Sequence, residues 1–378
     1  MSSLWELESC YAPRDVVIAG GGMAGLWSAY YLKVQDPSLR IMVLERNIVP
    51  TGASTRNAGF ACFGSVTELM QDVNECGKEK MLELVAMRYD GLRRINKVFE
   101  PQEIDYQRCG GYELITGKQY SSEKAIRKDI DWLNNSLEKV IQKKKVFKLA
   151  DKKISRFNFQ QTDHLVEAKL EGQLHPGKMV QALTRKLQGM GVVIRYGVEL
   201  KAYEEAVEKV IIHTAVTDPF YTSQLLICTN GFASNLLSGT PIIPARGQVL
   251  VTSPVNDLPF KGTFHYDEGY YYFRNVGNRV LLGGARNTAF DEEQTSELNV
   301  SDSIQQELER FLHERILPRQ NFTIDHRWSG IMGMGSTKFP TVRQLSASCF
   351  CLLGLGGMGV ALAPVSGEQV AKMMVKNR

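Results

Sequence analysis

A glycine-rich turn between a short apolar strand and a helix constrains this chain more than any other feature. Residues 15–19 form a β-branched, almost wholly apolar run, which is typical of a central parallel strand buried on both faces. The run leads directly into Gly20, Gly22 and Gly25, which satisfy the spacing G-x-G-x-x-G. Residues 26–34 then predict a helix, and residues 40–44 predict a second strand. The unit therefore predicts a strand–helix–strand fold that binds a dinucleotide.

Each part of this unit has a physical reason in nucleotide binding. Gly20 makes the tight turn, Gly22 lets the backbone approach the pyrophosphate, and Gly25 lets the helix pack closely on the strand. The helix N-terminus offers free N–H groups and a partial positive charge to the phosphates. Glu45 ends the second strand twenty residues after Gly25, where an acid meets the ribose hydroxyls. An ordinary strand–helix turn does not require Glu45, and an acid there favours a free 2′-hydroxyl over a 2′-phosphate.

The loop that follows separates FAD from NAD, because both cofactors share the first fingerprint. Residues 50–60 read P-T-G-A-S-T-R-N-A-G-F. This segment resembles the D-amino-acid oxidase-like family of FAD enzymes, which includes glycine and sarcosine oxidases. It is most similar to the branch typified by gamma-glutamylputrescine oxidoreductases, whose second flavin loop reads approximately G-A-S-x-R-N-x-G-F. The resemblance implies FAD as the cofactor, whereas a surface turn rich in Gly, Ser and Asn is the alternative.

Further landmarks of the family follow in the expected order. Residues 174–187 predict a helix that opens with L-H-P-G-K-M-V, and residues 192–194 a strand. Residues 225–231 resemble a strand that ends in a small-residue turn beside the nucleotide, and residues 244–249 the R-G-Q strand that enters the substrate domain. The cofactor-binding residues that the fingerprint and the resemblance together imply are Gly20, Gly22, Met23, Ala24, Gly25, Glu45, Arg46, Ala53, Ser54, Thr55, Arg56, Asn57, Ala58, Gly59, Leu200, Thr229, Asn230, Gly231, Gly357, Met358, Gly359 and Val360.

A second G-x-G-x-x-G spacing occurs at residues 354–359, after an apolar strand at 350–353. A second dinucleotide unit would need another strand and an acid about twenty residues further on, and the sequence ends before that position. The resemblance implies instead a glycine turn that leads into a final helix over residues 364–376, with Pro364 in its first turn. The backbone N–H groups at the start of that helix would favour the negative charge that a flavin gains on reduction. Residues 344–367 carry no charge, but their glycines favour a strand, a turn and a helix start over a membrane span.

Residues 261–286 predict a hairpin with an aromatic strand at 270–274, a turn at 275–278 and a partner strand at 279–284. Alternation places Tyr270 and Tyr272 on one face. By the resemblance, Tyr270 matches a tyrosine that contacts the substrate in glycine oxidases. The alternative is that these rings form the core of a sheet, because aromatic residues are strong strand formers.

Residues 326–333 match the W-x-G strand that lies beside the active site in this family. Glycine oxidases carry an arginine two residues after that glycine, which grips the substrate carboxylate. Here the position is Met332, so this bidentate clamp is missing. The departure favours an amine substrate, or one whose carboxylate is bound elsewhere. Arg274 or Arg56 would be replacements, although each is expected to make structural or cofactor contacts.

The resemblance implies that an amine loses a hydride to the flavin and that the resulting imine hydrolyses. The residues expected at the catalytic site are Tyr270, Tyr272, Trp328 and Met332. Members of the family that attach the flavin covalently use a histidine in the second loop or a cysteine further along the chain. Here the loop lacks a histidine and the W-x-G segment lacks a cysteine, so the resemblance implies that FAD is held non-covalently. Two alternatives remain open: a flavin-binding protein without turnover, such as an assembly factor or sensor, and an NAD-dependent dehydrogenase, which the second loop disfavours.

Composition limits the other classes of function. The formal net charge of the 378 residues is only +4, which gives no footprint for nucleic acid or an anionic membrane. Seven cysteines, an odd number, favour a reducing cytoplasm over a disulfide framework. No C-x-x-C or H-x-x-x-H spacing indicates a metal site, and residues 1–12 lack the pattern of a signal peptide. A small-molecule substrate is therefore the expected partner.

The predicted fold class is α/β with an α+β substrate part, in two discontinuous domains. A Rossmann-type FAD-binding domain is expected from residues 1–70, 155–240 and 335–378. A mixed-sheet substrate domain is expected from residues 71–154 and 241–334. Within the latter, the apolar spacing over residues 67–153 predicts mostly helix that covers the domain.

Overall fold

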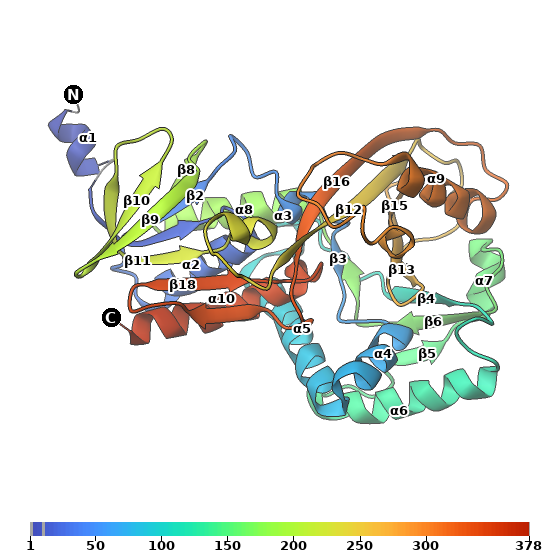
Figure 1. The fold of residues 1–378 in the computed structure, drawn as a ribbon. Helices are drawn as coiled ribbons and strands as arrows, with labels where there is room; N and C mark the ends of the chain where they lie inside the picture. Colours follow the sequence, from blue (N-terminus) through green and yellow to red (C-terminus); the bar gives the residue numbers. More distant parts are fainter. Residues whose placement is uncertain (1–2, 10–11, 378) are drawn as a thin grey trace. The chain divides into compact units, whose positions relative to one another are not determined.

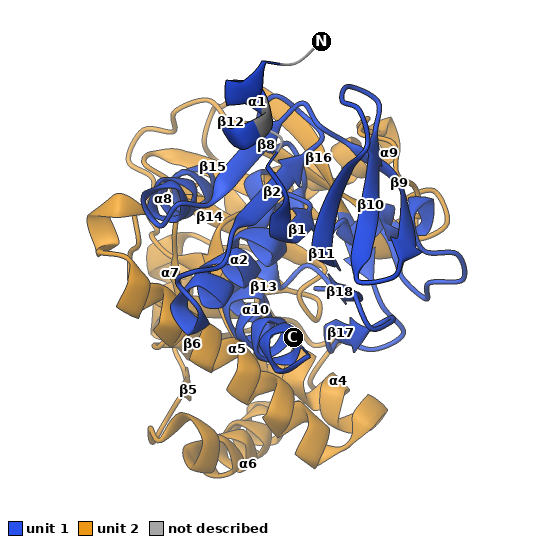
Figure 2. Ribbon diagram, turned by 90° about the vertical axis from the view of Figure 1, so that its left-hand side faces the viewer, with its two compact units in different colours: residues 1–55, 177–244, 332–378 blue, residues 56–176, 245–331 orange. Residues whose placement is uncertain are grey.

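The computed structural model describes residues 3–9 and 12–377, which form two compact units. Figure 2 shows unit 1 in blue and unit 2 in orange; unit 1 comprises residues 1–55, 177–244 and 332–378, and unit 2 comprises residues 56–176 and 245–331. Both units are discontinuous, because the chain passes from one to the other several times. The prediction that residues 1–12 lack a signal peptide concerns a segment of which residues 1–2 and 10–11 lie outside the described part. Helix α1 (Leu4–Ser9) lies between these two gaps.

Unit 1 is built on a sheet with the strand order β17-β18-β11-β1-β2-β8, to which the β9–β10 hairpin is attached through β11. Strands β18, β11, β1, β2 and β8 run parallel to one another. The strands of this sheet are β1 (Arg14–Ala19), β2 (Ile41–Glu45), β8 (Val193–Tyr196), β9 (Leu200–Ala206), β10 (Lys209–Thr214), β11 (Phe220–Ile227), β17 (Thr341–Gln344) and β18 (Cys349–Leu353). The predicted Rossmann-type architecture is confirmed. The central strands are apolar throughout because both faces of the sheet are covered.

Helices α2 (Met23–Gln35) and α10 (Gly359–Lys376) lie side by side against this sheet (Figure 1). Their backbones approach closely at Gly367, where a Cβ atom would lie 2.9 Å from the N atom of Ser28. Helix α8 (Pro176–Gly189) also belongs to unit 1, apart from its first residue, and it buries the apolar positions predicted for it.

The predicted start of the last helix at Pro364 is wrong. Helix α10 begins at Gly359, and Pro364 lies inside it. The residues before the proline include Ala361, Leu362 and Ala363, which are strong helix formers and are buried. Proline removes one N–H donor, which leaves the carbonyl of Val360 without its usual i+4 partner, and tertiary packing outweighs this loss.

Unit 2 contains most of a mixed sheet with the order β16-β12-β15-β14-β13-β4-β6-β5. Strands β13 and β4 are parallel, whereas the hairpin β14–β15 and its neighbours pair antiparallel. The strands are β4 (Gly111–Ile115), β5 (Phe147–Leu149), β6 (His164–Ala168), β12 (Ile243–Thr252), β13 (Thr263–Tyr266), β14 (Tyr271–Val276), β15 (Arg279–Gly284) and β16 (Ile324–Met334). A separate two-stranded sheet pairs β3 (Phe60–Ala61) with β7 (Gly172–Gln173). The predicted mixed-sheet second part is therefore present.

The helices of unit 2 are α4 (Val66–Cys76), α5 (Lys78–Val98), α6 (Glu123–Ile141), α7 (Lys152–Phe157) and α9 (Asp302–Phe311), with a π-helical turn at Leu312–Ile316 and a short 3-10 turn at Pro101–Glu103. The segment predicted as mostly helical, residues 67–153, contains α4, α5 and α6, but β4 and β5 interrupt it. An aromatic core holds the hairpin in place; the rings of Phe264 and Phe273, for example, stack with centroids 4.7 Å apart.

No helix within residues 3–9 and 12–377 is long and apolar enough to span a lipid bilayer. The uncharged segment 344–367 contains the end of β17, a short turn, strand β18, a glycine turn and the first half of α10. In the described part of the chain, Cys62, Cys76, Cys109, Cys228, Cys349 and Cys351 are all free thiols.

Candidate functional site

The glycine fingerprint of unit 1 adopts a turn that other residues could not form. Gly20 has φ +119°, and a Cβ atom there would lie 2.6 Å from the carbonyl oxygen of Cys228. A Cβ atom on Gly25 would lie 2.0 Å from the carbonyl oxygen of Gly20, so only glycine lets α2 begin this close to the end of β1. The arrangement fits the phosphate-binding turn that the spacing predicts.

Ser54 connects the second predicted loop to the first within unit 1. It lies in the short helix α3 (Ala53–Arg56), and its Oγ accepts a hydrogen bond of 2.8 Å from the N–H of Met23 in the first turn of α2. A Cβ atom on Gly22 would lie 2.7 Å from the same oxygen. The structure therefore brings together two segments that the sequence singled out separately.

Glu45 lies at the end of β2 and is 7% exposed. Its Oε2 accepts a hydrogen bond of 3.2 Å from the N–H of Gly21, and its Oε1 one of 3.1 Å from the N–H of Asn47. Burial raises the pKa of this carboxyl, while the two backbone donors act in the opposite direction. The neighbouring Arg46 places its guanidinium 3.8 Å from the ring centre of Phe232. The acid is thus fixed beside the glycine turn, where a dinucleotide ribose would need it.

Asn230 links the end of β11 to the C-terminal glycine turn. It opens the 3-10 segment Asn230–Asn235, has φ +46°, and its Oδ1 accepts a hydrogen bond of 2.9 Å from the N–H of Gly354. The N–H of Gly356 donates to the carbonyl of Gly333 at 3.1 Å, and a Cβ atom on Gly357 would lie 3.3 Å from Sδ of Met332. The end of β11, the end of β16 and residues 354–359 therefore meet in unit 1.

The cofactor-binding candidates of unit 1 follow neighbouring parallel strands. Residues 354–359 follow β18, residues 229–231 follow β11, the first glycine turn follows β1, and Glu45 ends β2. Because carboxyl ends of parallel strands lie at one edge of a sheet, these segments share that edge, which is where nucleotides bind in open α/β sheets. The Oγ1 of Thr229 is buried and has no hydrogen-bond partner among the described residues, so it is available to a ligand. The remaining candidate, Leu200, begins β9 and is buried.

The other half of the predicted flavin loop, residues 56–59, belongs to unit 2 and is tied to its sheet. Trp328 Nε1 donates a hydrogen bond of 2.9 Å to the carbonyl of Arg56, and Arg56 Nη1 donates one of 2.8 Å to the carbonyl of Ser329. The side chain of Asn57 accepts from the N–H of Gly59 at 2.8 Å. The W-x-G strand therefore holds the loop through a reciprocal pair of bonds.

Arg274 and Arg56, the two arginines considered as replacements at the Met332 position, both bind backbone carbonyls. Arg274 Nη1 donates to the carbonyls of Gly59 at 3.1 Å and Leu174 at 2.8 Å. Burial lowers the pKa of Arg274 to about 10. Arg56 Nη1 donates to the carbonyl of Ser329 within the same unit. Structural contacts of this kind are what the sequence led us to expect for these two side chains.

Tyr272 and Trp328 share an apolar cluster, whereas Tyr270 does not belong to it. The cluster contains Ala58, Phe60, Val249, Val251, Tyr272, Leu281 and Trp328. Burial raises the pKa of Tyr272 to about 12. Tyr270 precedes β14 in a turn and packs with the cluster that contains Tyr271 and Phe273. The predicted alternation therefore does not extend to Tyr270, because the strand begins only at Tyr271.

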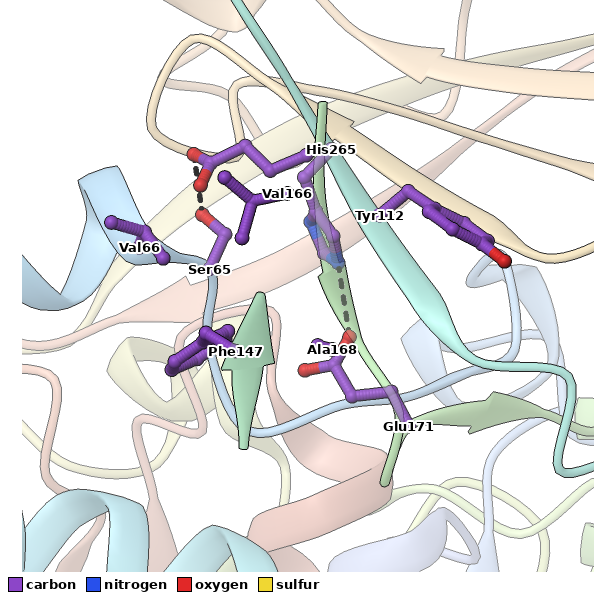
Figure 3. Close-up of a pocket in the computed structure, with 9 residues that line it drawn as sticks. Ser65, Val66, Tyr112, Phe147, Val166, Ala168, Glu171 and His265 are labelled. Carbon is purple, nitrogen blue, oxygen red and sulfur yellow. Dashed lines mark hydrogen bonds and ion pairs between the residues drawn. The ribbon is translucent and has the colours of Figure 1, made fainter. Parts of the chain in front are cut away.

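The sequence did not predict a buried acidic cavity in unit 2, which Figure 3 shows. Glu171 and His265 face each other across it, with 3.9 Å between His265 Nε2 and Glu171 Oε2. Burial raises the pKa of Glu171 to about 8, and it lowers the pKa of His265 to about 4. Glu113 also lines the cavity; its carboxylate accepts hydrogen bonds from Ser65 Oγ at 2.9 Å and from Thr67, and burial raises its pKa to about 7.

The cavity of about 10 Å³ has room for about one water and not for an organic substrate. Its polar residues come from the residue before α4, from β4 and β13, and from the turn before β7, and only the pairing of distant strands brings them together. No local spacing in the sequence marks them. Within residues 3–9 and 12–377, no group of three or more His, Cys, Asp or Glu side chains is placed to hold a metal ion.

Comparison with known proteins shows to which protein family this chain belongs. Residues 15–373 match the family described as "DAO: FAD dependent oxidoreductase", so the chain belongs to this family of FAD-dependent oxidoreductases. The predicted family and the predicted cofactor, FAD, are confirmed, and the NAD-dependent dehydrogenase alternative falls away.

Among individual relatives, gamma-glutamylputrescine oxidoreductase of Escherichia coli (strain K12) is 22% identical over 380 residues, with 95% of this chain and 83% of that protein covered. The probable oxidoreductase OrdL of Haemophilus influenzae is also 22% identical, over 385 residues, with 96% and 83% covered. Solved structures with the same fold include L-proline dehydrogenase from P. horikoshii, with a TM-score of 0.77, 17% identity and coverage of 97% and 94%. Glycine oxidase from Bacillus cereus gives a TM-score of 0.74 with 15% identity and coverage of 97% and 96%.

Proposed function

We propose that this FAD-dependent oxidoreductase oxidises the C–N bond of an amine or amino-acid-like substrate. Bound FAD supplies a two-electron acceptor for the hydride on the carbon beside the nitrogen. The substrate then leaves as an imine, and water converts it to a carbonyl compound and ammonia, or a smaller amine where the nitrogen carries a second substituent. The proteins to which this chain is similar include a gamma-glutamylputrescine oxidoreductase and a glycine oxidase, and this similarity supports the proposed class of reaction.

One observation supports the proposal more than any other. The segments after β18, β11 and β1, together with Glu45 at the end of β2, lie at one edge of a parallel sheet, and they are the segments in which the sequence placed most of the cofactor contacts. We propose that Gly20, Gly22 and Gly25 take the pyrophosphate, that Glu45 takes the ribose, and that residues 357–360 take the flavin end. The domain roles follow: unit 1 is proposed as the FAD-binding part and unit 2 as the substrate part.

The proposed tasks of the protein side chains are binding and exclusion of water. Tyr272 and Trp328 supply apolar surface, and the hydrogen bond from Trp328 to Arg56 keeps that surface rigid. Tyr270 and Met332 are proposed as further substrate contacts. No step requires a side chain to remove a proton from carbon, because the hydrogen leaves with its electron pair; the amine needs only to be neutral.

Two further expectations belong to this proposal. FAD is proposed to be held without a covalent bond, since the second flavin loop contains no histidine and the W-x-G segment contains no cysteine. The proposed cytoplasmic location rests on the odd number of cysteines.

The test is an anaerobic titration of the purified holoprotein with a panel of primary amines, secondary amines, polyamine derivatives and amino acids. The expected result is loss of the oxidised-flavin absorbance band with at least one member of the panel. A stable oxidised spectrum with every member would instead favour a flavin-binding protein without amine turnover, which the methionine at position 332 keeps as the second candidate.

A further inference from the structure

Arg286 is a half-buried cation next to two tyrosines that the sequence singled out. It follows the β14–β15 hairpin and opens the 3-10 turn Arg286–Thr288. Burial lowers the pKa of its guanidinium, and Tyr270 and Tyr272 are near enough to couple to it electrostatically. The guanidinium carbon lies 4.7 Å from the centre of the Phe290 ring, and Phe290 in turn packs edge-on against Tyr270. The cation therefore has an aromatic surround within unit 2.

Within residues 3–9 and 12–377, the guanidinium of Arg286 makes no hydrogen bond and no ion pair; its interactions with Tyr270, Tyr272 and Glu293 act at longer range. The acid that influences its pKa, Glu293, is already bound: its Oε1 accepts from Arg246 Nη2 at 2.6 Å and from Gln248 Nε2 at 2.8 Å. A half-buried arginine that stacks on one ring keeps the N–H donors at its edge available for an anion.

The backbone of the two residues before Arg286 fixes the position of this arginine. Gly284 has φ +122°, and a Cβ atom there would lie 1.9 Å from the carbonyl oxygen of Tyr270. Ala285 is fully buried with φ +60°, a conformation that an alanine rarely adopts, and its N–H donates to the same carbonyl at 2.9 Å. Strained backbone of this kind persists only where the surrounding structure holds it in place. The hairpin end is thus pinned to Tyr270, and Arg286 is the next residue.

Arg286 differs in this respect from the other arginines considered. Arg56 and Arg274 each donate to backbone carbonyls that hold the loop at residues 56–59. The position where glycine oxidases carry an arginine is the uncharged Met332. A cation without a polar partner, beside the candidate substrate tyrosines, therefore remains only at Arg286 among these four positions.

We propose that Arg286 binds a carboxylate of the substrate, so that the oxidised compound is an amine that also carries a carboxylate group. The planar guanidinium matches the two oxygens of a carboxylate, and two parallel N–H···O bonds fix its orientation. This inference rests on the proposed function, and it adds the substrate class to it.

The test compares two probes of equal shape, benzoate and benzamide, which differ in the negative charge. Each is titrated into the holoprotein, and binding is followed by calorimetry and by the change in the flavin spectrum. The variants are Arg286→Gln, Arg286→Lys and, as a matched control, Arg319→Gln, which removes an exposed arginine from the same unit. FAD content and melting temperature are recorded for each.

We expect the wild type and Arg319→Gln to bind benzoate at least about tenfold more tightly than benzamide, which corresponds to about 1.4 kcal/mol. Arg286→Gln should abolish that preference, and Arg286→Lys, which keeps the charge but not the fork, should reduce it. A wild type that does not discriminate, or an Arg286→Gln variant that still does, overturns the inference. If Arg286→Gln loses FAD, Arg286→Lys decides the question. An unchanged preference of this variant for benzoate over benzamide overturns the inference, and a reduced preference supports it.

These outcomes are independent of turnover. If the proposed function is wrong, no amine will reduce the flavin. If the carboxylate site is wrong, benzoate and benzamide will bind equally well, and neither of these probes can be oxidised as an amine. If the protein prefers benzoate through Arg286 but no amine reduces its flavin, the carboxylate site is supported and the proposed amine oxidation is not.

Discussion

The side chain of Asn230 accepts a hydrogen bond from the N–H of Gly354 at 2.9 Å, although the two residues are 124 positions apart. The bond joins the end of β11 to the glycine turn after β18, two strands that are neighbours in the sheet of unit 1. Both residues lie in segments for which the sequence indicated cofactor contacts. A single side chain therefore joins two of the segments that are proposed to bind FAD.

Replacing Asn230 should test this link directly. Asn230→Ala removes the acceptor for Gly354 and places alanine at φ +46°, so we expect a loss of about 1–3 kcal/mol in the free energy of unfolding. Asn230→Gly also removes the acceptor but tolerates the backbone, and should lose less. FAD affinity, measured by fluorescence of the released flavin, should fall in both. Unchanged FAD affinity in both variants would show that the link does not support the cofactor.

Gly25 should tolerate no side chain. In Gly25→Ala the Cβ atom would lie 2.0 Å from the carbonyl oxygen of Gly20, so the start of α2 must move away from β1. We expect a loss of about 2–4 kcal/mol in unfolding free energy, or a protein without bound flavin. The matched control is Gly189→Ala at the end of α8, where no atom lies within 4 Å of the added methyl group. Equal melting temperatures for the two variants would contradict this account of the turn.

The buried acids of unit 2 should make stability depend on pH. The pKa of Glu171 is about 8 in the folded protein against 4.5 without its surroundings, so the folded state retains a proton that the unfolded state releases. Stability from this group is complete below about pH 4.5 and is lost as the pH rises towards 8. Glu113, with a pKa of about 7, acts in the same direction.

Glu171→Gln removes this titration. The difference in unfolding free energy, variant minus wild type, should therefore increase as the pH rises from about 5 to 8. Its slope should approach about 1.4 kcal/mol per pH unit. Denaturant unfolding at a series of pH values measures the difference. Glu83→Gln, on the exposed side of α5, is the control and should give a flat difference. A flat difference for Glu171→Gln as well would mean that its carboxyl is not held protonated.

The reciprocal bonds between Trp328 and Arg56 should act as one unit. Trp328→Phe removes the donor to the carbonyl of Arg56, and Arg56→Gln removes the donor to the carbonyl of Ser329. Each change should cost about 1 kcal/mol, and the double variant should lose less than the sum because either bond alone orients the other. Thermal melts of the four proteins complete this double-mutant cycle. Strict additivity would show that the two bonds act independently.

The sequence predicted those parts of the fold that local patterns determine. The run from Asp15 to Glu45 contains its own strand, turn, helix and strand signals, and the structure reproduces them in order. The start of the last helix was predicted wrongly because Pro364 is a strong local signal for a first turn, whereas packing of α10 against α2 begins earlier. The position of Tyr270 was predicted wrongly for a similar reason: alternation assumes a strand that in fact starts one residue later.

Features made by distant strands could not be predicted in this way. Glu113 and His265 belong to neighbouring strands, β4 and β13, that are separated by about 150 residues in the chain, and only the sheet brings them to one cavity. No motif or spacing in the sequence distinguishes Arg286 from other arginines in loops. Its lack of a polar partner becomes visible only when the partners of Arg246, Arg274 and Glu293 are known.

Single-turnover product analysis tests amine oxidation by the bound flavin: the holoprotein is mixed anaerobically with its best substrate from the amine panel, and the products are counted. We expect one carbonyl product and one reduced flavin for each FAD bound, with the flavin released as free FAD when the protein is denatured. Reduction of the flavin without a carbonyl product, or an oxidised flavin after exposure to every amine, would contradict it.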